Sequence, residues 1–275
     1  MDGALPIAET DLGGVCSDGA LLASRIPNRI ALAGGWIDQP FISRQNPEPP
    51  GSMVVVSLEP GCWFMDRCGM AGSTRRVATK VWDGVLPGRP PAALVRELSR
   101  AENASKSEPS GSQDMIGLIY PGVSRLDYDA DVDGGLFPAH IESNCESDVA
   151  AWLEKVLHLI PVNQRPPGYN PIDIRNLRPE WIARLGRTGR DCFAGIVGKS
   201  IRRLGAAMNE CMTCWEAILP HTVSHPSINI DFRAILAWAQ ARHPGAMYSG
   251  CGGGYLIVVS EEAVPGSLHI KVRTR

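Results

Sequence analysis

The sequence predicts an α+β protein built from two parts, and three features of its pattern support this fold class. Strand-like segments with alternating or β-branched residues stand near the start, at 24–34 and 52–60. Segments with apolar residues at helical spacing dominate the stretch from about 178 to 242. Three further strand candidates, AMYSG, YLIVVS and SLHIKVR, follow them. We place the boundary so that an N-terminal domain covers 1–145 and a C-terminal domain covers 146–275.

The composition excludes several classes of partner. The chain has 275 residues, of which 44% are hydrophobic and 20% charged, enough to bury a substantial core. A formal net charge of −2 offers no basic face, so we expect no nucleic-acid partner. No window reaches the roughly 18 to 20 apolar residues that cross a bilayer, and the first residues lack a signal-peptide pattern. We therefore expect a cytoplasmic protein without a membrane partner, in which the eight cysteines are reduced thiols.

The elements predicted for the N-terminal part alternate between strands and helices. The first strand ends in a tight turn at Gly34 and Gly35. In EPSGSQDMIGLIYPG, a serine precedes a short apolar helix that stops at Pro-Gly, so Asp114 falls in its first turn. Unpaired backbone amides at a helix start favour an ionised carboxylate there. The other elements expected here are a helix in TRRVATKVWDG, a helix at 90–103, and strands at 125–129 and around 140–143.

The C-terminal part is predicted to be mainly helical before its closing strands. A helix from 146 to about 156 and the strand LHLIPV lead into RPPGYNP, which we interpret as a flexible or substrate-facing loop. Cys211 and Cys214 form a CxxC motif inside a predicted helix, without a second pair or a nearby His pair, which favours packing thiols over metal or redox chemistry. The four helices expected after this loop are at 178–185, 187–198, 201–219 and 230–242.

Three segments carry the residue types that a small-molecule site needs. Arg29 and Asp38 flank the Gly34-Gly35 turn and offer a cation and an acceptor for sugar hydroxyls, although a structural ion pair would have the same sequence. The stretch 69–74 allows backbone amides to approach a phosphate, or is an ordinary helix N-cap. The glycine cluster at 250–254 is a plain hairpin or permits close backbone contact with a ligand.

Taken together, these segments resemble the motifs of the GHMP kinases, the superfamily of galactokinase, homoserine kinase, mevalonate kinase and phosphomevalonate kinase. Four segments follow the order of that family's motifs: RIPNRIALAGGWID, GMAGST, PSGSQD and MYSGCGGGYLIVV. An R-x-P-x-R-x-x-x-x-G-G-x-x-D opening at 25–38 and G-x-Q-D at 111–114 are most similar to the fucose and D-glycero-D-manno-heptose 7-phosphate kinases. Further likeness appears in Met208-Asn209-Glu210 and in the His-Pro at 225–226. The resemblance as a whole covers about residues 24–273.

The resemblance implies a fold and an activity. The expected fold is an N-terminal domain like that of ribosomal protein S5 domain 2 and a ferredoxin-like C-terminal domain enlarged by helices, with the ligand cleft between them. The expected activity is in-line transfer of the γ-phosphoryl group of ATP, with Mg²⁺, to a sugar or sugar phosphate at the anomeric hydroxyl, giving a sugar 1-phosphate. The implied partner is therefore a small molecule, and a homodimer is compatible with this activity.

The resemblance also implies a role for each matching residue. Asp114 would orient or deprotonate the attacking hydroxyl, Arg29 would lie near the transferred phosphoryl group, and Asp38 would accept hydrogen bonds from the sugar. Trp36 would stack on a sugar face, or belong to the core. The remaining assignments are Arg25 and Gly35 to substrate binding, Gly69, Met70, Ala71, Gly72, Ser73, Thr74 and Arg75 to nucleotide binding, Gly250, Gly252 and Gly253 to closure of the site, and Ser73 and Glu102 to the metal.

Departures from the family pattern define the alternatives. The usual second motif reads close to G-L-G-S-S-S, whereas Ala71 here adds a Cβ where backbone must approach phosphate, and Arg75 and Arg76 follow. The stretch from Asp38 to Gly69 is also short. One alternative is therefore a catalytically degenerate relative that binds a sugar or sugar phosphate as a binding or regulatory protein. Another is a kinase for a mevalonate-like or amino-acid alcohol, which the Arg-x-x-x-Arg opening disfavours.

Overall fold

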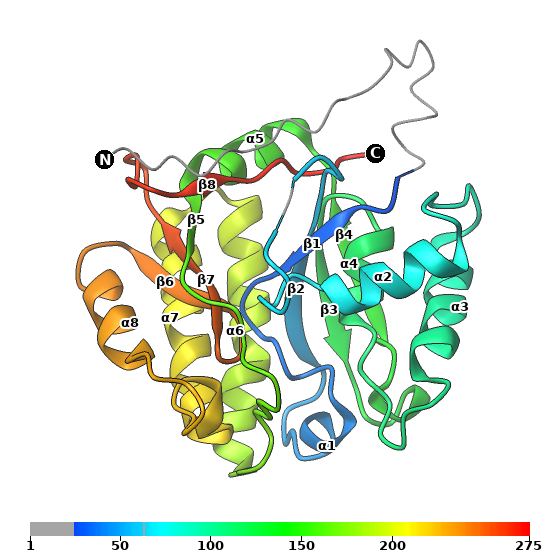
Figure 1. Ribbon diagram of the computed structural model, residues 1–275, viewed down its shortest axis with the longest axis horizontal. Coiled ribbons are helices and arrows are strands. Elements are labelled where there is room, and N and C mark those ends of the chain that lie inside the picture. Colours follow the sequence, from blue (N-terminus) through cyan, green and yellow to red (C-terminus); the bar gives the residue numbers. More distant parts are fainter. Residues whose placement is uncertain (1–24, 63) are drawn as a thin grey trace.

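The computed structural model describes residues 25–62 and 64–275, and these form two antiparallel sheets that share a pair of long helices (Figure 1). The strand order is β1-β2-β3-β4 in the first sheet and β6-β7-β5-β8 in the second. The signal-peptide prediction and Cys16 fall on residues 1–24, outside the described residues.

The first sheet is built from the N-terminal half of the chain. All eight residues of its second strand are buried, because this strand has a neighbour on each side and helices packed against it. Helix α4 packs on β1 and β2, while α2 and α3 pack on α4 (Figure 1). The elements are β1 (Asn28–Ala31), α1 (Pro40–Ser43), β2 (Gly51–Leu58), α2 (Gly72–Val81), α3 (Pro91–Asn103), α4 (Gln113–Ile119), β3 (Val123–Tyr128) and β4 (His140–Asn144).

The second sheet and the shared helices come from the C-terminal half. Helices α6 and α7 pack against each other, α6 covers β2 and β3 of the first sheet, and α7 covers β6 of the second. Together the two helices join the sheets through one continuous core. The elements are α5 (Ser147–Val156), β5 (Leu157–Pro161), α6 (Pro179–Val197), α7 (Ile201–Ile218), the 3-10 turn η3 (Pro220–Thr222), α8 (Phe232–Gln240), β6 (Gly245–Gly250), β7 (Gly253–Val259) and β8 (Leu268–His269).

The continuous helix α6 corrects the prediction of two helices at 178–185 and 187–198. Gly186 and Gly189 lie where the helix approaches β2. A Cβ on Gly186 would lie 3.0 Å from the Cα of Gly51, and one on Gly189 would overlap the backbone of Ser52. These glycines therefore let the helix lie close to the sheet, and they do not interrupt it.

The closing strand candidate SLHIKVR also differs from its prediction, because its two ends belong to different sheets. Residues 268–269 form β8 beside β5, but Val272 bridges to Leu58 at the end of β2. The backbone N–H of Arg273 donates to the Ser57 carbonyl at 2.9 Å, and its buried guanidinium donates to the Ile119 carbonyl at 2.7 Å, at the end of α4. This segment and α6 both connect the two halves that we place at 1–145 and 146–275.

Most of the described cysteines are buried. None of the described helices is long and apolar enough to cross a membrane. The seven cysteines within the described residues are free thiols. Cys211 and Cys214 are fully buried on α7, where Cys211 Sγ accepts a hydrogen bond from the Gly34 amide at 3.3 Å, as packing thiols would.

Candidate active site

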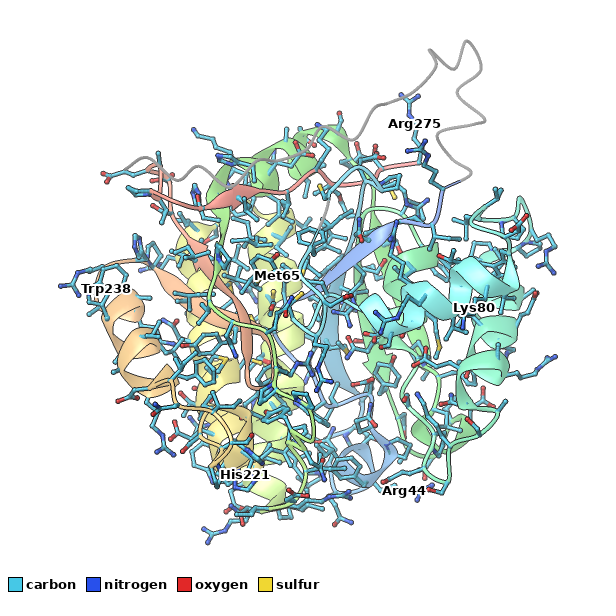
Figure 2. All side chains as sticks on the ribbon, in the orientation of Figure 1. Arg44, Met65, Lys80, His221, Trp238 and Arg275 are labelled. Carbon is cyan, nitrogen blue, oxygen red and sulfur yellow. The ribbon has the colours of Figure 1, made fainter. Side chains whose placement is uncertain are left out.

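A cavity of about 510 Å³ lies where loops of both sheets converge, and most of the predicted site residues line it. Met65, labelled near the centre of Figure 2, belongs to its wall. The predicted residues in the lining are Arg29, Gly35, Trp36, Asp38, Gly69, Ala71, Gly72, Ser73, Glu102, Asp114 and Gly250. Four segments that are far apart in the sequence therefore meet at one place.

Asp114 is held by two donors from neighbouring elements. It lies in the first turn of α4, as the sequence predicts, and its carboxylate forms an ion pair with Arg29 of β1. The Thr74 hydroxyl on α2 donates to Asp114 Oδ2 at 3.2 Å, and Arg29 Nη1 donates to the Gly69 carbonyl at 3.2 Å. Burial lowers the pKa of Arg29 to about 10, so this side chain remains a cation at neutral pH. The Asp114 side chain is 26% exposed, which leaves it accessible from the cavity.

Asp38 is a second carboxylate in the lining, and it is only 1% exposed. Burial raises its pKa to about 6, although the nearby Arg29 charge acts in the opposite direction. Gln39 Nε2 donates to Asp38 Oδ2 at 3.2 Å, whereas Oδ1 has no hydrogen-bond partner among the described residues. The backbone at Gly111 approaches so closely that a Cβ there would overlap this carboxylate. Asp38 thus offers a fixed acceptor for a hydroxyl.

Three further buried polar atoms in the lining have no hydrogen-bond partner within residues 25–62 and 64–275: Arg29 Nε, Glu102 Oε2 and Gln113 Oε1. Buried polar groups are nearly always paired in folded proteins, so a cluster of unpaired ones at a cavity indicates a polar ligand. Glu102 also accepts a hydrogen bond from Lys106 at 3.0 Å through its other oxygen.

The start of α2 supplies the segment predicted to hold a phosphate. Ala71 has a left-handed backbone with φ of 54°, and no side chain in the described part of the chain caps the helix start. The first amides of a helix have no acceptor within the helix, and the residues Gly72 and Ser73 that carry them here line the cavity. Met70 is buried and Thr74 contacts Asp114, and neither side chain belongs to the cavity lining.

The C-terminal glycine cluster packs on this loop. A Cβ on Gly69 would lie 2.6 Å from the Ser249 carbonyl oxygen, and one on Gly250 would lie 2.8 Å from the Gly69 Cα. The Ser249 hydroxyl donates to the Cys68 carbonyl at 2.6 Å and fixes the same contact. Gly250 therefore lines the cavity as part of a glycine-to-glycine contact.

Other predicted residues lie outside the cavity lining. Gly252 packs on the Tyr169 ring, and Gly253 packs on Phe232. Arg25 is exposed and forms an isolated bridge with Val85. Arg75 Nε donates to the carbonyls of Ile26 and Pro27, each at 3.2 Å, so it points away from the nucleotide position predicted for it. The neighbouring Arg76 does line the cavity, where it pairs with the exposed Asp66 at 3.1 Å.

The cavity contains more positive charge than the sequence indicated. Arg165 and Tyr169 come from the loop RPPGYNP, so this loop faces the cavity. Arg165 Nε donates to the Arg67 carbonyl at 3.2 Å, so this loop rests on the segment before Gly69. The described residues that line the cavity include the cations Arg29, Arg67, Arg76, Lys106 and Arg165 and the carboxylates Asp38, Glu102 and Asp114. This balance favours an anionic ligand.

Trp36 has features of both roles expected for it, a ring at the ligand site and a residue of the core. Its ring lines the cavity but also packs edge-on against Phe41, with centroids 6.4 Å apart. Its indole N–H contacts Cys251 Sγ at 3.0 Å, and its φ of 81° is unusual for a bulky residue. The ring is therefore held in a fixed position at the cavity wall.

Comparisons with known proteins agree with this architecture. No protein-family model and no curated protein matches the sequence. Among solved structures, the chain is similar to mevalonate kinase of Methanococcus jannaschii, with a TM-score of 0.54 and 11% identity over 86% of this chain and 90% of that chain. It is also similar to a D-glycero-D-manno-heptose 1-phosphate kinase of Bacteriodes thetaiotaomicron, with a TM-score of 0.52 and 10% identity over 91% and 96% of the two chains. Galactokinase of Lactococcus lactis, complexed with galactose, gives a TM-score of 0.54 and 13% identity over 86% and 84%. At such low identity the likeness concerns the fold alone, and the chain has the α+β fold, with its antiparallel sheets, of the GHMP kinases.

Proposed function

We propose that this chain is an ATP-dependent kinase that phosphorylates a hydroxyl group of a sugar or sugar phosphate. The observation that carries this proposal is the Arg29–Asp114 ion pair in the wall of a cation-rich cavity, next to the start of α2. Solved kinases for mevalonate, a heptose phosphate and galactose share the fold, which supports phosphoryl transfer to an alcohol.

In the proposed reaction, Asp114 orients the attacking hydroxyl and accepts its proton. Arg29 compensates the charge of this carboxylate, and its Nε, which has no hydrogen-bond partner among the described residues, is available to the charge that develops during transfer. The Thr74 hydroxyl fixes the orientation of the Asp114 side chain from α2. Rate enhancement then comes mainly from positioning and charge compensation, as is usual for phosphoryl transfer.

The side chains of Ser73 and Glu102 fit a magnesium ion. Both line the cavity, both offer the oxygen ligands that Mg²⁺ prefers, and Glu102 Oε2 is buried without a partner among the described residues. Mg²⁺ bound by these groups would neutralise charge on the phosphates of the nucleotide.

The side chains on the other walls of the cavity favour a sugar or sugar phosphate as the acceptor. Asp38 presents an oxygen without a partner among the described residues for a sugar hydroxyl, and Trp36 lines the same cavity. Arg67, Lys106 and Arg165 provide cations for an acceptor that is already phosphorylated. Transfer to the anomeric hydroxyl, with a sugar 1-phosphate as the product, is the specific reaction that the sequence motifs favour.

One structural observation favours a second candidate, a catalytically degenerate sugar-binding or regulatory protein. The Gly69 carbonyl accepts from Arg29, and the loop before α2 packs tightly on Gly250. Both contacts restrict the loop that would have to surround a triphosphate. A protein of this kind would bind a sugar phosphate without binding ATP.

The decisive experiment combines titration calorimetry of Mg-ATP with a turnover assay over a panel of sugars, sugar phosphates and mevalonate-like alcohols. We expect Mg-ATP binding and a phosphorylated product whose position is assigned by phosphorus NMR. Asp114→Asn should lower turnover by roughly 10² to 10⁴. Asp131→Asn, a change of the same size at an exposed site outside the cavity lining, is the control.

Each contrary outcome has a distinct meaning. Binding of a sugar phosphate without any binding of Mg-ATP would exclude the kinase and support the second candidate. Full activity in Asp114→Asn would exclude the assigned chemistry. Turnover with a mevalonate-like alcohol alone would keep the kinase and exclude the sugar.

A further inference from the structure

A cluster of metal-ligand side chains lies beside the cavity and has no role in the proposed reaction. The ligand-type atoms of Asp173, His221 and His225 all lie within 4.8 Å of one another. Asp173 belongs to the long loop after β5, while His221 lies in η3 and His225 in the loop that follows. Figure 2 labels His221 near the lower end of α7, where these segments meet. Three side chains from two separate segments thus converge.

The geometry of the cluster is close to that of a coordination site. The two imidazole rings are 4.6 Å apart between centroids, with 77° between their planes. His225 Nε2 lies 4.0 Å from Asp173 Oδ2. Protein ligands bind zinc at about 2.0 to 2.2 Å, so two ligands on one ion are about 3.4 Å apart in a tetrahedral arrangement. A closure of well under 1 Å would therefore bring these two atoms to a common ion.

The surrounding contacts leave these atoms available. His221 Nδ1 is buried and has no hydrogen-bond partner among the described residues. Asn170 donates to Asp173 Oδ1, which leaves Oδ2 on the side of His225. An unpaired buried ring nitrogen costs free energy unless a ligand satisfies it.

We propose that Asp173, His221 and His225 bind one first-row divalent transition-metal ion, with Zn²⁺ as the preferred ion. Two imidazoles and one carboxylate suit Zn²⁺ and its transition-metal neighbours, whereas Mg²⁺ and Ca²⁺ require oxygen ligands throughout. With three protein ligands, the fourth position is occupied by water.

Neighbouring groups support the ligands, as the outer contacts of metal sites generally do. His225 Nδ1 lies 2.7 Å from the Ser227 hydroxyl, whose oxygen can accept a hydrogen bond from Nδ1–H when Nε2 binds the ion. The Ser227 amide donates to the same Nδ1 at 3.1 Å, so metal binding at Nε2 requires the other His225 tautomer and replaces this amide hydrogen bond by the one to the hydroxyl. The Tyr169 hydroxyl donates to the His221 carbonyl at 2.8 Å, and its ring packs against His225 with centroids 4.9 Å apart.

The position of the ion gives it a structural role. Tyr169 and Pro171 line the cavity, and Asp173 follows them on the same loop. The Gly252 amide donates to the Thr222 carbonyl at 2.8 Å, next to His221. A bound ion would therefore fasten the substrate-facing loop to η3 and, through it, to the glycine hairpin. This inference concerns binding only, so it holds whether or not the chain is a kinase.

The test uses the full-length protein after treatment with a chelator and dialysis. Co²⁺ is titrated as a spectroscopic substitute, Zn²⁺ affinity is measured by competition with a chromophoric chelator, and bound metal is counted by mass spectrometry. We expect one ion per chain and a cobalt spectrum without thiolate charge transfer. Asp173→Asn, His221→Gln and His225→Gln should each weaken binding by about 100-fold or more, and Asn170→Ala by roughly 10-fold. His140→Gln, on the exposed strand β4, should leave affinity unchanged.

Two results would overturn the proposal. The first is equal affinity in wild type and in the triple variant. The second is a thiolate spectrum that disappears in Cys145→Ser, because the exposed Cys145 would then be the ligand. Near-UV circular dichroism checks folding of the histidine variants. The Asp173 side chain is 52% exposed and asparagine has the same size, so Asp173→Asn should fold normally. This variant therefore tests the proposal even if the histidine variants do not fold.

Discussion

Replacing Asp38 by asparagine tests how burial controls ionisation in the cavity. Burial raises the pKa of Asp38 from the usual 3.8 to about 6. The folded state therefore binds this proton more tightly than the unfolded state does. Between about pH 4 and pH 6 the free energy of unfolding should fall as pH rises, and above pH 6 the loss is complete. A rise of about two pKa units corresponds to a loss of roughly 3 kcal/mol at neutral pH.

Asp38→Asn keeps the size of the side chain and removes the charge. At pH 8 we expect the variant to be more stable than wild type by about 2 to 3 kcal/mol, and near pH 4 the two should have equal stability. Urea unfolding at several pH values from 4 to 8 measures this difference directly. Asp66→Asn, at an exposed carboxylate, should change stability by less than about 0.5 kcal/mol throughout. The reasoning is refuted if Asp38→Asn is no more stable at pH 8, or if its advantage does not shrink toward pH 4.

Three further substitutions test other contacts. Gly189→Ala should destabilise by about 1 to 3 kcal/mol in denaturant unfolding, because the added Cβ would meet the Ser52 backbone. Gly61→Ala, where a Cβ meets no described residue within 4 Å, is the control, and equal stability of the two variants would contradict the close packing of α6. Arg273→Met should cost about 1 to 3 kcal/mol, since it leaves the buried Ile119 carbonyl without its donor, and a melting temperature equal to that of wild type would disprove this. Thr74→Val should lower kcat by about 10-fold or more with little change in KM, because it removes the hydroxyl that donates to Asp114. Thr74→Ser keeps that hydroxyl and should retain activity. Similar kcat values for both variants would show that the Asp114 contact is dispensable.

The parts of the fold that the sequence predicts well are those with a strong local pattern. The valine-rich strand expected at 52–60 is β2 at Gly51–Leu58, and the helix expected at 90–103 is α3 at Pro91–Asn103. Asp114 is in the first turn of α4 because a serine-led loop and a Pro-Gly stop delimit that helix locally. The continuity of α6 could not be predicted in the same way, since its glycines are explained by contact with β2, far away in the sequence.

In the candidate site, too, residues within sequence motifs could be predicted, and residues brought in by long-range packing could not. Motif positions placed Arg29, Asp38 and Asp114 at one cavity, but they did not identify Arg67 or Arg165, which no motif covers and which reach the cavity through loop packing. Helical geometry also separates residues that are adjacent in sequence, because neighbours on a helix point about 100° apart. Arg75 therefore turns toward the backbone before β1, whereas Arg76 turns toward the cavity.

The segment at 268–273 limits the movements by which a ligand can enter and leave. Its first residues pair with β5 and its last with the end of β2, and the Lys271 carbonyl accepts the Glu59 amide at 2.8 Å. Hinge opening of the two sheets would have to break these bonds together with the α6 contacts on β2. Exchange of ligand should therefore proceed by displacement of single loops, on a time scale faster than rigid-body domain rotation.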